Sequence, residues 1–185
     1  MAGRRTDTRQ RIQEIALELF SERGYEQTTL QEVAERLEIT RPALYYHFKA
    51  KEDILNGVIE DLNASLDELV EWARAQPHTA AAKREILGRI ADLLEDRWRP
   101  LFRFAQVNQT AMERIPAGEG MQERLITLLS VLTTPGADPV RQFEERLAVF
   151  ALILGTLPFL FEMELPEDQR TATAMTVAAK LVSGQ

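Results

Sequence analysis

The sequence contains no cysteine and only two histidines among its 185 residues. Without cysteine the chain cannot form disulfides or thiolate metal sites. His47 and His78 lack the HxxxH or HxxE spacing of a metal site, and we find neither a Gly-x-Ser-x-Gly nucleophile motif nor a glycine-rich phosphate loop. These absences argue against an enzyme, and we expect no cofactor and no bound metal.

Long hydrophobic runs are also missing. The longest apolar run, Leu147 to Phe161, is shorter than the roughly 18 residues of a membrane span. Arg4 and Arg5 are followed by an amphipathic, charged segment and not by the apolar run of an export signal. We therefore expect a cytoplasmic protein that makes no contact with a membrane.

Positive charges are outnumbered, with 22 Lys and Arg against 29 Asp and Glu and a formal net charge of −7. The imbalance is uneven: residues 1–51 carry a net charge of +1, and residues 52–185 carry −8. Only the N-terminal part is suited to approach a polyanion such as DNA.

Helical periodicity runs through nearly the whole chain, and no segment shows convincing strand alternation, which predicts an all-α fold. A buried stripe with helical spacing opens the chain: Ile12, Ile15, Ala16, Leu19 and Phe20. About nine helices are expected in total. The later ones are predicted at about 51–77, 80–96, 100–115, 119–132, 139–163 and 166–182, with a break before Pro100 and a kink at Pro158.

Two short helices near the N-terminus have clear start signals. Thr29 and Glu32 form a Thr-x-x-Glu capping box, and Thr40 precedes a second helix with Pro42 in its first turn. Only residues 38–40 separate the two helices, which predicts a helix-turn-helix. We divide the chain into a three-helix domain at residues 1–50 and a helical bundle at 51–185.

The second helix of this motif has an unusual outer face. Leu44 and Phe48 share its inner face. Polar tips and flat rings cover the outside: Arg41, Pro42, Ala43, Tyr46 and Lys49, flanked by Tyr45 and His47. Packing does not require such a surface, whereas a helix in the DNA major groove needs both phosphate and base-edge contacts.

The stretch "TTLQEVAERLEITRPALYYHFKAKEDIL" resembles the DNA-binding region of TetR-family transcriptional regulators over about residues 8–60. The resemblance implies that Arg41, Pro42 and Ala43 face the bases. It implies mainly phosphate contacts for Thr29, Thr40, Tyr45, Tyr46, His47 and Lys51. One departure is Glu38, which stands where the family usually has glycine; we expect a left-handed backbone there.

For the C-terminal part, the resemblance implies a ligand-binding bundle and a homodimer through the last two helices. Candidate interface residues are Gly155, Ala172, Met175, Ala179 and Val182. Candidate pocket residues are large and mostly apolar, which predicts a small apolar effector: Trp72, Leu94, Trp98, Phe102, Gln106, Met112 and Phe159. Ordinary core packing is the alternative interpretation of both sets.

The sequence therefore predicts a homodimeric, ligand-responsive repressor that binds a pseudo-palindromic double-stranded DNA operator through helix 41–48. An effector near Trp98 and Phe102 would tilt the helix that begins at Lys51 and release the DNA. Two alternatives stay open: a DNA-binding regulator without an effector, and a helical protein-interaction scaffold that does not bind DNA.

Overall fold

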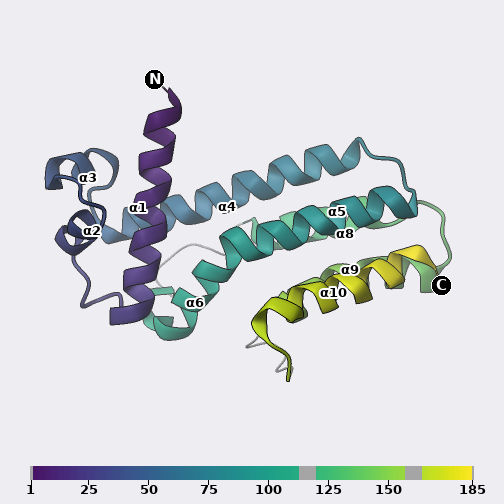
Figure 1. Ribbon diagram of the computed structural model, residues 1–185. Helices are drawn as coiled ribbons and strands as arrows, with labels where there is room; N and C mark the ends of the chain where they lie inside the picture. Colours follow the sequence, from purple (N-terminus) through teal and green to yellow (C-terminus); the bar gives the residue numbers. More distant parts are fainter. Residues whose placement is uncertain (1, 113–119, 157–163, 185) are drawn as a thin grey trace. The chain divides into compact units, whose positions relative to one another are not determined.

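Every regular element of the computed structural model is helical, which confirms the all-α prediction; the structure describes residues 2–112, 120–156 and 164–184 (Figure 1). The helices are α1 (Ala2–Arg23), α2 (Leu30–Arg36), α3 (Arg41–His47), α4 (Lys51–Arg74), α5 (Ala80–Leu93), the π-helical turn η1 (Leu94–Trp98), α6 (Arg99–Val107), α7 (Gln109–Met112), α8 (Met121–Leu132), α9 (Pro139–Thr156) and α10 (Glu167–Ser183). None of these helices is long and apolar enough to cross a membrane.

The helices form two compact units. Unit 1 contains residues 1–62 and 100–119, and unit 2 contains residues 63–99 and 120–185. Helix α4 contributes its first half to unit 1 and its second half to unit 2. This structural division differs from the functional domains at 1–50 and 51–185, which stay a prediction.

Unit 1 is built around an aromatic cluster that includes a residue distant in sequence. Phe20 and Tyr25 meet edge to face with their ring centroids 5.0 Å apart, and Phe104 of α6 lies 5.9 Å from Phe20 and 6.0 Å from Tyr25. The Asn108 side chain joins the same region: its amide donates to the Phe20 carbonyl at 3.0 Å, and its oxygen accepts from the Tyr25 N–H at 2.7 Å. These contacts attach the segment around α6 to the end of α1.

Unit 2 has an apolar core to which α4, α5, α8, α9 and α10 all contribute. Helices α9 and α10 lie side by side (Figure 1). At Gly155 of α9 they approach so closely that an added Cβ would overlap the Cβ of Ala174 on α10. The prediction that Gly155 faces a partner chain is therefore wrong, because the residue packs against its own chain.

A buried ion cluster also joins three parts of unit 2. The Lys83 ammonium of α5 donates to the Glu145 carboxylate of α9 and to the hydroxyl of Thr134, in the loop before α9. Arg141 lies 3.0 Å from Glu145, and its guanidinium donates to the Leu181 and Val182 carbonyls near the end of α10. The cluster satisfies groups that would otherwise be costly to bury.

The predicted helix break before Pro100 is also wrong. Instead of breaking, the chain continues through η1, where the Arg99 N–H donates to the Leu94 carbonyl five residues earlier. Such a π-helical turn accommodates Pro100, which has no N–H to continue the α-helical pattern. The kink predicted at Pro158 lies outside the described residues.

Candidate nucleic-acid interface

Helix α2 begins with the predicted capping box. The Thr29 hydroxyl accepts from the Glu32 N–H at 3.2 Å, and the Glu32 carboxylate accepts from the Thr29 N–H at 2.8 Å. This backbone hydrogen bond is the main reason that the pKa of Glu32 lies below its usual value. Both interactions fix the start of α2, and they leave the Thr29 side chain exposed.

The turn after α2 has the predicted left-handed residue. Glu38 has a φ of 55°, the one positive φ at a non-glycine position in the part of the chain that the structure describes. Its N–H donates to the Glu35 carbonyl at 3.1 Å, and the Ile39 N–H donates to the Ala34 carbonyl at 3.0 Å. These two bonds form a Schellman motif, which ends α2 sharply and sets the direction of the chain into α3.

Replacing Glu38 by glycine should change the free energy of unfolding by less than about 1 kcal/mol. Relief of left-handed strain favours the variant by about that amount, and the greater backbone entropy of unfolded glycine opposes it. Urea titration of both proteins checks this. Gly24→Ala is the control, since Gly24 has a φ of 90° and alanine there should destabilise. A loss above about 2 kcal/mol in Glu38→Gly would show a contact of the Glu38 side chain that explains its presence.

Helix α3 presents the predicted two faces. Leu44 and Phe48 are buried in unit 1, whereas Arg41, Pro42 and Ala43 are exposed. Tyr46 is also outward, with 61% of its surface exposed. Because the buried anchors hold α3 in place, its outer face is free to enter a groove without any cost to packing.

Local contacts position the polar side chains of this face. Thr40 caps α3 by accepting from the Ala43 N–H at 3.4 Å. Arg41 donates to the Tyr45 hydroxyl at 3.1 Å, with its guanidinium carbon 5.1 Å from the Tyr45 ring centroid. The rings of Tyr46 and His47 meet edge to face at 5.3 Å. These contacts restrain the long side chains before any ligand arrives, which lowers the entropy cost of binding.

Lys51 is placed differently from the other predicted DNA contacts. Its ammonium donates to the Tyr25 carbonyl at 2.5 Å and lies 4.4 Å from the Tyr25 ring centroid. The side chain therefore connects the start of α4 to the loop after α1. A DNA phosphate bound by Lys51 would share the ammonium with the Tyr25 carbonyl. The role of Lys51 in DNA binding stays a prediction.

The predicted effector residues are divided between the two units. Trp72, Leu94 and Trp98 belong to unit 2, and Phe102 and Gln106 belong to unit 1, where Gln106 is exposed. Met112 ends α7, and Phe159 lies outside the described residues. Leu94 is buried in the unit 2 core, and Trp98 packs against that core. A single pocket formed by this set stays a prediction.

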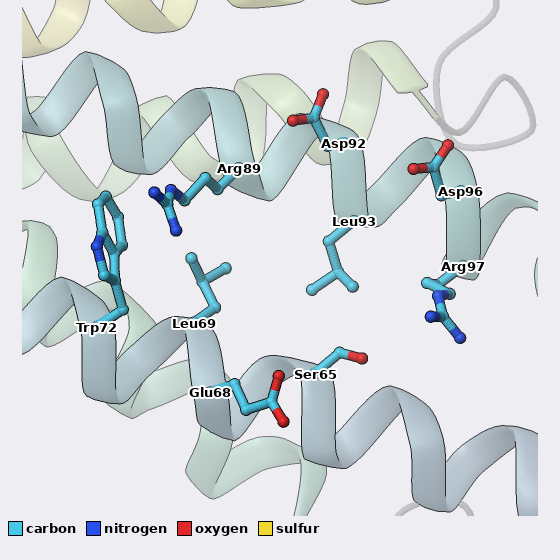
Figure 2. Close-up of a pocket in the computed structure, with 9 residues that line it drawn as sticks. All are labelled: Ser65, Glu68, Leu69, Trp72, Arg89, Asp92, Leu93, Asp96 and Arg97. Carbon is cyan, nitrogen blue, oxygen red and sulfur yellow. The ribbon is translucent and has the colours of Figure 1, made fainter. Parts of the chain in front are cut away.

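Trp72 lines a groove of about 320 Å³ in unit 2 (Figure 2). The lining residues are Ser65, Glu68, Leu69 and Trp72 of α4, Arg89, Asp92 and Leu93 of α5, and Asp96 and Arg97 of η1. Apart from Trp72 they were missed by sequence reasoning, which searched for apolar residues. The sequence held a signal for them. The lining residues of α4, and those of α5 and η1, each repeat at i, i+3, i+4 and i+7, which is the spacing of one helix face.

Comparison with known proteins concerns mainly unit 1. Residues 12–58 match the family model of the tetR family of bacterial regulatory proteins. The chain is 41% identical over 63 residues to the HTH-type transcriptional regulator AcrR of Shigella flexneri, covering 34% of this chain and 29% of that protein. It is 38% identical over 73 residues to the HTH-type transcriptional repressor KstR2 of Rhodococcus jostii, covering 37% of this chain and 34% of the repressor. The matched region thus spans about a third of each relative.

The fold also has relatives among solved structures. A transcriptional regulator of Aquifex aeolicus superimposes with a TM-score of 0.64, covering 91% of this chain and 96% of that one, at 19% sequence identity. A TetR-family regulator of Mesorhizobium loti gives a TM-score of 0.58, covers 98% of both chains and is 15% identical. At such identities the likeness extends to the fold alone.

Proposed function

We propose that this chain, which belongs to the TetR family of transcriptional regulators through residues 12–58, is a ligand-responsive repressor that binds its operator through α3. The observation that carries the proposal is the division of α3 into buried anchors, Leu44 and Phe48, and an outward face with Arg41 and Tyr46. We assign DNA binding to residues 1–50. Ligand binding and dimerisation are assigned to residues 51–185.

The proposed homodimer uses the last two helices. On α9, large apolar side chains with exposed fractions of 38 to 65% repeat at i, i+4, i+7 and i+11: Phe143, Leu147, Phe150 and Leu154. An exposed apolar stripe of this kind is suited to cover the same stripe of a second copy. On α10, Val177 is 45% exposed, and Val182 is fully buried in its own unit and unavailable to a partner.

Two-fold symmetry would present two copies of α3 to the DNA. We therefore expect a pseudo-palindromic operator whose half-sites are separated by about one helical turn, roughly 34 to 36 Å. The expected phosphate contacts are those of Thr29, Thr40, Tyr45, Tyr46, His47 and Lys51, with base contacts from Arg41, Pro42 and Ala43. A small-molecule effector would lower the affinity for this operator.

The test is selection of bound sequences from a random double-stranded DNA pool, followed by titration of the selected operator at several salt concentrations. A regulator that contacts phosphates should lose affinity steeply as salt rises, because binding releases counterions. Enrichment of no sequence, together with the absence of salt-dependent DNA binding, would favour a protein-interaction scaffold. Operator binding that no metabolite or drug in a library changes would favour an effector-independent regulator.

Replacing Tyr46 by alanine should weaken operator binding by about 1 to 3 kcal/mol, the range of a good groove contact. Helical content and the thermal midpoint should stay unchanged, because Tyr46 is exposed and the anchors of α3 remain. Gel-shift titration measures the affinity. Ile126→Ala, which truncates a similarly exposed side chain on α8, is the control and should bind as the parent does. Unchanged affinity in Tyr46→Ala would exclude Tyr46 from the interface.

A further inference from the structure

The groove between α4 and α5 is lined by charged side chains as well as apolar ones. Leu69 and Leu93 point into it from opposite sides, and the Trp72 ring stands at one end (Figure 2). Around this apolar floor lie three carboxylates and two guanidinium groups, which leave a net charge of −1. The volume of about 320 Å³ lies within the range of small-molecule sites.

The carboxylates of Glu68, Asp92 and Asp96 are available to a ligand. Within the part of the chain that the structure describes, none of the three forms a hydrogen bond or ion pair with another side chain. Glu68 lies one turn before Trp72 on α4, so both side chains line the same wall of the groove. The groove thus offers an aromatic surface beside unpaired negative charge, which favours a cationic ligand.

Arg89 already occupies the position that such a ligand would take. Its guanidinium carbon lies over the Trp72 ring, 3.5 Å from the ring centroid. Arg89 has a second partner at the same time, because its guanidinium donates to Glu85 at 3.3 Å, one turn earlier on α5. Both Arg89 and Glu85 are about half exposed, so moving Arg89 away from the ring costs little.

We propose that this groove binds a small planar organic cation, of the aromatic amidinium or guanidinium class, which replaces Arg89 on the face of Trp72. Glu68 faces the positive charge, and Leu69 and Leu93 contact the apolar part of the ligand. The inference rests on the proposed function, since it names the chemical class of the effector, and it replaces the apolar effector expected from the sequence.

The first test uses isothermal titration calorimetry on the whole chain without DNA. The probes are benzamidinium and its neutral counterpart of nearly equal shape, benzamide. Benzamidinium should bind, and benzamide should bind roughly tenfold more weakly or not at all, since only the cation gains from the ring and the carboxylates. Equal affinities for the two probes, or no binding of benzamidinium, overturn the proposal.

Matched variants locate the site. Glu68→Gln and Trp72→Phe should both weaken binding of benzamidinium by several-fold or more. Glu71→Gln makes the same charge change on α4, but Glu71 pairs with Arg74 and does not line the groove, so the variant should bind as the parent does. Equal losses in Glu68→Gln and Glu71→Gln would indicate a general charge effect and overturn the site.

The displacement of Arg89 gives a separate prediction. Arg89→Ala frees the Trp72 ring and should increase the affinity for benzamidinium several-fold. Arg97→Ala removes the same charge from the groove without freeing the ring, and it should increase the affinity less. Equal gains in the two variants would contradict displacement.

Failure of this inference and failure of the proposed function can be told apart. The calorimetric measurements involve no DNA, and operator affinity is measured on the free protein without any probe. Loss of the operator complex on addition of benzamidinium, absent in Glu68→Gln, would support both proposals. A free protein that selects no operator overturns the proposed function and leaves the calorimetric result on the groove standing.

Discussion

Lys83→Met should lower the free energy of unfolding by about 3 to 5 kcal/mol at neutral pH, the range for breaking a buried ion pair by removing one partner. Lys83 is 2% exposed, and the Glu145 carboxylate that its ammonium contacts is 0% exposed. Methionine fills the space of the aliphatic stem but removes the ammonium, so Glu145 keeps only Arg141, 3.0 Å away, as a countercharge. Urea unfolding followed by circular dichroism measures the loss.

The loss should depend on pH in a defined direction. Burial raises the pKa of Glu145, but hydrogen bonds from Lys83 and Thr134 outweigh it and hold this pKa below its ordinary value of 4.5. In the parent protein the resulting stabilisation is present above that value and is lost as the pH falls through the lower folded-state pKa. Without Lys83 fewer groups oppose the effect of burial, so the pKa of Glu145 rises and the carboxylate accepts a proton more readily. The stability difference between variant and parent should therefore shrink between pH 7 and pH 4.5.

The double variant Lys83→Met/Glu145→Met is the control for this explanation. It removes both buried charges, and such replacements are often neutral or stabilising. Arg141 keeps the Glu144 carboxylate and the two carbonyls near the end of α10 as partners. Most of the lost stability should return. A double variant as unstable as Lys83→Met would mean that lost packing, and not a buried carboxylate that has lost Lys83, causes the destabilisation.

Gly155→Ala should destabilise the chain by about 1 to 3 kcal/mol, the usual cost of overpacking. The new Cβ would overlap the Cβ of Ala174, so α9 and α10 would have to move apart. The effect is expected on folding itself and not only on dimerisation. Denaturant titration at two protein concentrations distinguishes these, since a loss that arises at a subunit interface depends on concentration.

The matched control is Gly88→Ala. Gly88 lies in the interior of α5, and an added Cβ would meet no atom within 4 Å. Alanine there should stabilise the chain by about 1 kcal/mol through its higher helix propensity. The two substitutions are chemically identical and are expected to have opposite signs. A stabilised Gly155→Ala would mean that α9 and α10 adjust without strain.

Local features of the helix-turn-helix were predictable from the sequence. The Thr29 capping box, the left-handed backbone at Glu38 and the buried positions of Leu44 and Phe48 all depend on residues within a few positions of one another. Capping, turn chemistry and helical periodicity act over this distance, so a single sequence contains the information.

Features that depend on distant residues were not predictable. Lys83 and Glu145 are 62 positions apart, and each is an ordinary charged residue in its own segment. The close approach at Gly155 depends on which helix lies beside α9, and the groove depends on which faces of α4 and α5 meet. A helix break was predicted before Pro100 because proline has no N–H to donate to an α-helical hydrogen bond. The π-helical turn η1 removes the need for that N–H, so the helix continues.

The attachment of Phe104 in α6 and of Asn108 to the end of α1 limits how this protein can be divided for engineering. A fragment ending near residue 62 would contain α1 to α3 but would leave Phe20 and Tyr25 without Phe104, and the Tyr25 N–H without Asn108. Swapping DNA specificity between relatives by exchanging only the N-terminal residues would join two surfaces that had not evolved together. A working chimera should therefore carry residues 100–112 from the same parent as residues 1–62.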